Sequence, residues 1–142
     1  MVDPGLMARI NRMEQALKRL EYYTSLSLDE IREQDLIPAL EREVHVVIEA
    51  LLDIGNNLIS SMGWGVPTSY REIAFILMRN NVLDRELGAK LASLAGLRNI
   101  LVHLYSMVDY DLLYSHARDL VRDARHILDK IIRYMVEHGI DP

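Results

Sequence analysis

The sequence predicts an all-α protein, an up-and-down helical bundle of about five helices in a single domain spanning residues 1–142. Three observations lead to this prediction. Apolar residues recur every three or four positions over long stretches, which is the period of a helix. Only 7 glycines and 4 prolines interrupt the 142 residues, and no strand-like alternation is sustained. The connections between helical stretches are short, as in antiparallel bundles.

The first helix is expected directly after Asp3-Pro4. This pair combines a capping residue with a proline at the first helical position. One apolar stripe then follows at helical spacing: Leu6, Ile10, Met13, Leu17 and Leu20.

A long second helix is expected from the capping-box pair Ser27 and Glu30 to about Ile59. Pro38 indicates that the regular part of this helix begins near Leu36, because proline is tolerated only in a first helical turn. The loop "SMGWGVPTS" follows, with two glycines and a proline.

Two further helices are expected after that loop. Ser69 and Glu72 have capping-box spacing and open a short third helix to about Asn80. Asp84 can cap a fourth helix that runs to about Ser106.

The fifth helix is expected to start at Asp109 or Asp111 and to end at Gly139. Its apolar face consists of Leu113, Ala117, Leu120, Ala124, Ile127, Ile131 and Tyr134. Together with the second helix, it is long enough to form the backbone of the bundle.

Composition narrows the class of protein. The net charge of −5 disfavours non-specific nucleic-acid binding, so any contact with RNA needs a local basic patch. Cysteine is absent, which excludes disulfides, thiolate metal sites and a cysteine nucleophile. No apolar run is long enough to span a bilayer, and the first residues lack a signal-peptide pattern. These features predict a cytoplasmic protein without membrane association.

The stretch "LRNILVHLY", residues 97–105, holds the candidate chemistry. On a helical wheel, Arg98 and Tyr105 share one flank of the apolar face, while Asn99 and His103 lie on the other side. Arg98 and His103 are about 140° apart on an ideal wheel, so one straight helix does not point them at one atom. A loosened helix end, or a two-fold axis near Val102 in a homodimer, would bring them together.

These residue types suit metal-independent RNA cleavage. The attacking 2′-hydroxyl must lose a proton and the leaving oxygen must gain one, and histidine can serve either step near neutral pH. The planar fork of arginine can hold the phosphate oxygens as negative charge develops. Spacing alone nevertheless favours an ordinary solvated helix surface for these three side chains.

The motif Arg98, four residues, His103, one residue, Tyr105 resembles the signature of the HepT-like branch of the HEPN superfamily. The segment "VVIEALLDIGNNLIS" is similar to the second-helix region of that family, and "PTSYREIAFILMRNNVLD" to the loop and helix before the catalytic helix. Chain length and helix order agree as well.

This resemblance implies a ribonuclease toxin of a type II toxin–antitoxin pair, acting on tRNA or mRNA without a metal or other cofactor. It implies a homodimer whose cleft carries the motif from both subunits. Arg98 and His103 become the catalytic pair, and Asn99 supports phosphate binding. The implied partner is a minimal nucleotidyltransferase antitoxin, which neutralises the toxin by transferring AMP to Tyr105.

Many family members have glycine directly after the histidine, where this chain has Leu104. Leu104 fits the apolar stripe, so the helix is expected to continue past the motif. This departure favours an alternative in which the chain is a catalytically inert subunit that presents a nucleotide or substrate to the nucleotidyltransferase.

Two polar clusters outside the motif have two interpretations each. The resemblance implies that Asp53 faces the motif helix and pairs with Arg98 or His103, although a surface polar cluster explains it equally well. Three arginines, Arg118, Arg122 and Arg125, form a basic row on the fifth helix that could follow an RNA backbone. Neighbouring aspartates neutralise much of this row, which favours a solvated face.

Overall fold

The computed structural model describes residues 4–103 and 110–140; for residues 99–103 it defines the backbone alone. Within these ranges the chain forms helices and no strand, which confirms the all-α prediction. The helices are α1 (Pro4–Ser25), α2 (Leu28–Glu33), α3 (Ile37–Met62), α4 (Tyr70–Arg79), α5 (Arg85–His103) and α6 (Tyr110–Glu137).

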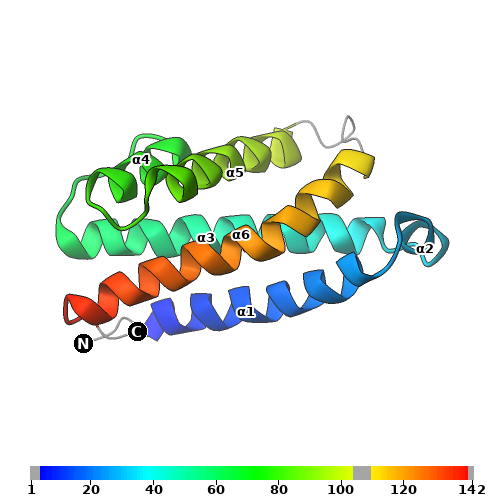
Figure 1. Cartoon of the computed structure of the whole chain (residues 1–142), viewed down its shortest axis with the longest axis horizontal. Coiled ribbons are helices and arrows are strands. Elements are labelled where there is room, and N and C mark those ends of the chain that lie inside the picture. The colour runs from blue at the N-terminus through cyan, green and yellow to red at the C-terminus, as the bar shows by residue number, and fades with distance from the viewer. Residues whose placement is uncertain (1–3, 104–109, 141–142) are drawn as a thin grey trace.

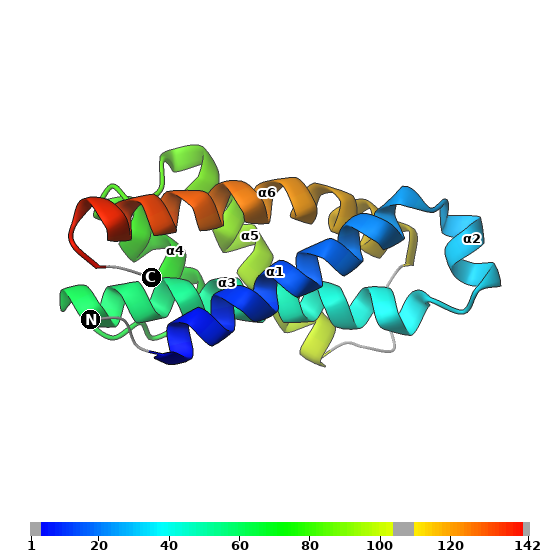
Figure 2. The ribbon, with the colours of Figure 1, turned by 90° about the horizontal axis from the view of Figure 1, so that it is seen from below.

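The long helices α1, α3 and α6 pack side by side, and α4 and α5 cover the other side of α3 and α6 (Figure 1). The view from below shows α1 lying diagonally across α3 and α6 (Figure 2). On the opposite side, α5 crosses from α6, where it begins, to α3, where it ends. No helix in the described part of the chain combines the length and apolarity needed to cross a membrane.

The expected second helix is divided into α2 and α3. The capping box is confirmed: the Glu30 amide donates to Ser27 Oγ at 3.1 Å, and the Ser27 amide donates to Glu30 Oε1 at 3.2 Å. The resulting helix ends at Glu33 because Asp35 takes a left-handed conformation with a φ of 55°. Pro38 lies in the first turn of α3, so the predicted boundary near Leu36 is confirmed.

The remaining helix starts follow the predicted caps closely. Ser69 Oγ accepts from the Glu72 amide at 3.2 Å, while the Glu72 carboxylate accepts from the Thr68 amide at 3.2 Å. At the start of α5, Asp84 Oδ1 accepts from the Leu87 amide at 2.8 Å. Ser106, where we expected the fourth helix to end, lies outside the described residues. The described part of α5 ends at His103.

The core is centred on α3, which packs against α1, α4, α5 and α6. Its buried apolar residues are spread along most of its length: Leu40, Val44, Val47, Ile48, Ala50, Leu51, Leu52, Ile54, Leu58 and Ile59. Gly55 allows α4 to approach, since a Cβ there would lie 3.1 Å from a Leu77 methyl and 3.2 Å from an Ile73 methyl. This packing fixes α3 as the rigid support for the polar residues on its outer face.

Candidate active site

Arg98 is held from two sides near the end of α5. Its Nε donates to Glu49 Oε1 of α3 at 2.5 Å. Its guanidinium carbon lies 4.4 Å from the centre of the Tyr70 ring at the start of α4, a cation–π contact. The side chain is only 18% exposed. The charged hydrogen bond and the aromatic face therefore fix the orientation of the guanidinium.

The carboxylate that binds Arg98 belongs to a polar row on α3. His45, Glu49 and Asp53 follow one another at four-residue spacing and so lie on one face of the helix. His45 Nε2 lies 3.7 Å from the same Glu49 oxygen that Arg98 contacts. Glu49 therefore links a titratable imidazole to the motif arginine.

Two arginines of α1 lie beside this row. A cavity of about 170 Å³ is lined by Arg9, Arg12, His45, Val46, Glu49, Ala50 and Asp53. Partial burial, followed by the neighbouring charge of Glu49, raises the pKa of Asp53. The charges of Arg9 and Arg98 act in the opposite direction on this pKa. The cavity thus brings two cations of α1 to a carboxylate pair on α3, and Arg98 of α5 contacts the same pair through Glu49.

This arrangement can bind and polarise an anion. Guanidinium groups recognise phosphate oxygens through paired N–H donors, and a nearby imidazole can exchange protons near neutral pH. In the described part of the chain, Arg12 forms no ion pair, unlike Arg98. A phosphate in the cavity would meet Arg12, with Arg98 held nearby on Glu49.

The structure describes the side chains of only some of the predicted site residues. Arg98 lies in the cluster just described, and Asp53 lies on the same α3 row, one turn after the carboxylate that pairs with Arg98. His103 is the last described residue of α5 and Asn99 lies within that helix, and only their backbones are described. Tyr105 lies outside the described residues, as does Leu104 and with it the expected continuation of the helix.

Sequence reasoning missed Glu49 as the partner of Arg98, and with it the roles of His45, Arg9 and Arg12. A signal was present, because the four-residue spacing of His45, Glu49 and Asp53 places three ionisable groups on one face of a largely apolar helix. The contribution of α1 had no such signal, because it depends on the angle at which α1 crosses α3.

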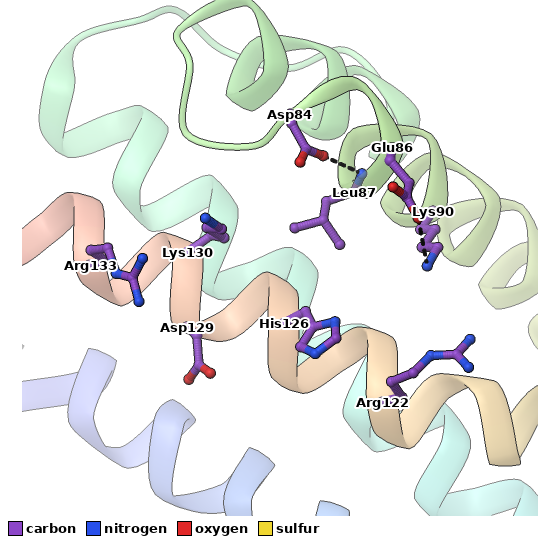
Figure 3. Close-up of a pocket in the computed structure, with 9 residues that line it drawn as sticks. All are labelled: Asp84, Glu86, Leu87, Lys90, Arg122, His126, Asp129, Lys130 and Arg133. Carbon is purple, nitrogen blue, oxygen red and sulfur yellow. Dashed lines mark hydrogen bonds and ion pairs between the residues drawn. The ribbon is translucent and has the colours of Figure 1, made fainter.

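The expected basic row on α6 is divided between two sides of the helix. Arg125 points to α1, where it pairs with Glu14 at 3.4 Å and also with Glu21. Arg122 instead lies toward α5, where it lines a hollow of about 740 Å³ (Figure 3).

The chain is therefore an all-α bundle in which Arg98, near the end of α5, is held in one orientation by a carboxylate and an aromatic ring. The family model described as "Ribonuclease HepT-like" matches residues 13–131. The chain belongs to this family, which lies within the HEPN superfamily.

Individual relatives agree with this assignment. A putative RNase of Archaeoglobus fulgidus is 30% identical over 131 residues, covering 84% of this chain and 98% of the relative. The mRNA nuclease HepT of Shewanella oneidensis is 31% identical over 83 residues, covering 58% of this chain and 62% of that relative, so the match spans less than two thirds of its length.

Two solved structures share the fold. The tri-AMPylated Shewanella oneidensis HEPN toxin, in complex with its MNT antitoxin, superposes with a TM-score of 0.81 at 23% identity, covering 92% of this chain and 98% of the toxin. The cytosolic protein YutE of Bacillus subtilis gives a TM-score of 0.81 at 28% identity, covering 99% of this chain and 95% of YutE.

Proposed function

We propose that this chain is a ribonuclease toxin that cleaves RNA without a metal ion. The observation that carries the proposal is the fixed guanidinium of Arg98, hydrogen-bonded at 2.5 Å to Glu49, which lines a cavity together with Arg9 and Arg12. Membership of the ribonuclease HepT-like family supports it. So do relatives named as mRNA and tRNA nucleases, which also indicate mRNA or tRNA as the substrate class.

In the proposed mechanism, the 2′-hydroxyl of the substrate attacks the adjacent phosphorus and the bond to the 5′-oxygen breaks. His103 exchanges a proton with the attacking or the leaving oxygen. Arg98 stabilises the negative charge that develops on the non-bridging oxygens, and its fixed orientation avoids reorganisation during the step. Asn99 supports phosphate binding, and Asp53 adjusts the electrostatics of the cluster. A homodimer places two copies of the motif in one cleft, which brings Arg98 and His103 to the same phosphate.

We further propose that a partner protein inhibits this ribonuclease. A structural neighbour is a HEPN toxin described as tri-AMPylated and bound to an MNT antitoxin. We infer a corresponding nucleotidyltransferase antitoxin for this chain, with Tyr105 as the residue that receives AMP. An added adenylate would place negative charge and bulk two residues from His103, where it would repel an RNA phosphate. The cytosolic description of YutE supports the cytoplasm as the site of action.

The test is cleavage of labelled tRNA and mRNA by the purified protein in EDTA. Wild type is expected to cleave, and His103→Ala to lose at least about 100-fold in rate, the lower end of the usual contribution of an acid–base group. His116→Ala, on α6, is the matched control and should cleave like wild type. If wild type and His103→Ala leave the same low level of cleavage on every RNA, the ribonuclease proposal is refuted. The chain would then be better explained as an inert subunit that presents a nucleotide or substrate to the nucleotidyltransferase.

A further inference from the structure

A polar groove lies between α5 and α6, at the opposite end of α5 from the motif. Its hollow of about 740 Å³ is lined from α5 by Lys90 and Glu86 and from α6 by Arg122, His126 and Lys130, among others (Figure 3). A second hollow of about 310 Å³ shares Asp84, Lys130 and Arg133 with the first, so the two adjoin. Neither hollow contains a motif residue, so the active site described above does not account for this groove.

A buried carboxylate beside the groove organises the cations at one end of it. Asp123 is 8% exposed, and its Oδ1 accepts from Lys90 Nζ at 3.1 Å and from Arg122 Nε at 3.2 Å. The hydrogen bond to Asp123 raises the pKa of Lys90, so this ammonium group stays charged. One buried anion therefore holds two cations, from two helices, at the same end of the groove.

The other end of the groove combines two cations with the carboxylates of Asp84, Asp129 and Glu137. Among the described residues, Lys130 and Arg133 form no ion pair, and both are exposed. Lys130 points toward the connection between α4 and α5, whereas Asp129 points away from it (Figure 3). Asp84 is engaged in capping α5 through the Leu87 amide.

The shape of the groove suits a strand better than a small ion. Along α6 it extends from Arg122 to Glu137, which at about 1.5 Å per residue is roughly 22 Å. His126, Lys130 and Arg133 follow Arg122 at three- or four-residue spacing, so positive or titratable groups recur about every turn. Cations repeated along a groove are how proteins follow a nucleic-acid backbone.

We propose that the groove between α5 and α6 binds phosphates of the RNA substrate several nucleotides away from the scissile one; this rests on the proposed ribonuclease function. The axis of α5 links the two sites. From Lys90 to Arg98 it rises about 12 Å, which a stacked strand with one phosphate per roughly 3.4 Å spans in about four nucleotides. Contacts in the groove increase the affinity for RNA and fix which phosphate reaches the motif, and the motif performs the cleavage.

The test measures RNA affinity in a background that cannot cleave. A fluorescent single-stranded RNA of about 16 nucleotides, at the upper end of typical site sizes, is titrated with His103→Ala protein over a range of salt concentrations. Adding Lys130→Gln and Arg133→Gln is expected to weaken binding about 10-fold. It should also reduce the slope of log affinity against log salt by about 1.4, the value for two lost phosphate contacts on a single strand.

The matched control is Lys18→Gln with Arg42→Gln, which removes the same net charge from exposed positions on α1 and α3. It should change affinity less than twofold. Equal affinity for the groove and control variants would overturn the proposal even if wild type cleaves RNA, and so would a parent that binds no RNA. A groove variant that keeps its RNA affinity but loses a co-expressed nucleotidyltransferase would identify the groove as a protein interface and also overturn it. Absence of wild-type cleavage, in contrast, refutes the proposed nuclease.

Discussion

Arg125 and Arg98 each link two helices of the bundle, and their surroundings differ. Arg125 on α6 pairs with Glu14 and Glu21 of α1, and all three side chains are between 36% and 45% exposed. Arg98 on α5 contacts Glu49 through a side chain that is 18% exposed, packs on the Tyr70 ring and lies near a further carboxylate whose pKa is raised.

The comparison separates a structural ion pair from a candidate site. Around Arg125, two carboxylates surround one cation, and water screens all three charges, so the cluster contributes about 1 kcal/mol or less to stability. Around Arg98 the arginines Arg9 and Arg12 line a cavity, and the pKa of Asp53 is raised because the attraction of Arg9 and Arg98 does not offset burial and the charge of Glu49. A carboxyl group with a perturbed pKa beside a cavity is a feature of candidate functional sites.

Replacing Arg98 is expected to have the largest effect on the rate of RNA cleavage. Arg98→Ala removes the donor that would face the developing charge on the phosphate, so RNA cleavage should fall at least about 100-fold. The matched variant Arg125→Ala should cleave at the wild-type rate and lose about 1 kcal/mol or less of unfolding free energy. Initial cleavage rates and thermal melts of both variants check this. Similar cleavage by the two variants would erase the distinction between the clusters.

A smaller effect is expected from Glu49, which acts through Arg98. Without its carboxylate, the guanidinium loses its anchor on α3, so Glu49→Ala should lower kcat about 10-fold with little change in KM. Glu49→Gln should restore most of kcat, because the amide oxygen still accepts from Arg98 Nε. Glu21→Ala, at the other cluster, is the control. An Ala variant with wild-type kcat, or a Gln variant as slow as Ala, would contradict a positioning role.

The comparison also shows what the sequence could predict. Helix starts at Ser27, Ser69 and Asp84 followed from local capping chemistry, which depends on a few adjacent residues. The break at Asp35 was missed because the left-handed conformation of one residue is not encoded in the apolar period. Pro38 nevertheless placed the start of the regular helix near Leu36, which the structure confirms.

Long-range pairs were harder to predict. The partner of Arg98 lies 49 positions earlier in the chain, and choosing Glu49 over Asp53 requires the rotation of α3 relative to α5 to within one turn. The resemblance to a family located the motif arginine correctly on a helix beside α3, but it did not determine which carboxylate the arginine contacts. Likewise, Arg122 and Arg125 share a row in the sequence but face different helices in the bundle.

The smallest predicted effect is a change in thermal stability when Asp53, a carboxylate near Arg98, is replaced. Partial burial and the charge of Glu49 raise its pKa in the folded state, so folding favours the protonated carboxyl. The stability that this preference provides is complete below the ordinary aspartate pKa and is lost as pH rises through the folded pKa. At neutral pH the ionised Asp53 therefore costs stability, and Asp53→Asn should raise Tm by about one to three degrees.

That gain should fade as the pH is lowered toward the ordinary aspartate pKa, because the wild-type side chain then becomes neutral as well. Thermal melts of wild type and Asp53→Asn between neutral and acidic pH measure the difference directly. Asp129→Asn, at an exposed position on α6, controls for the removal of one surface carboxylate. A lower Tm for Asp53→Asn at neutral pH would mean that attraction to Arg9 and Arg98 outweighs burial. The carboxylates beside Arg98 would then be compensated after all, like those around Arg125.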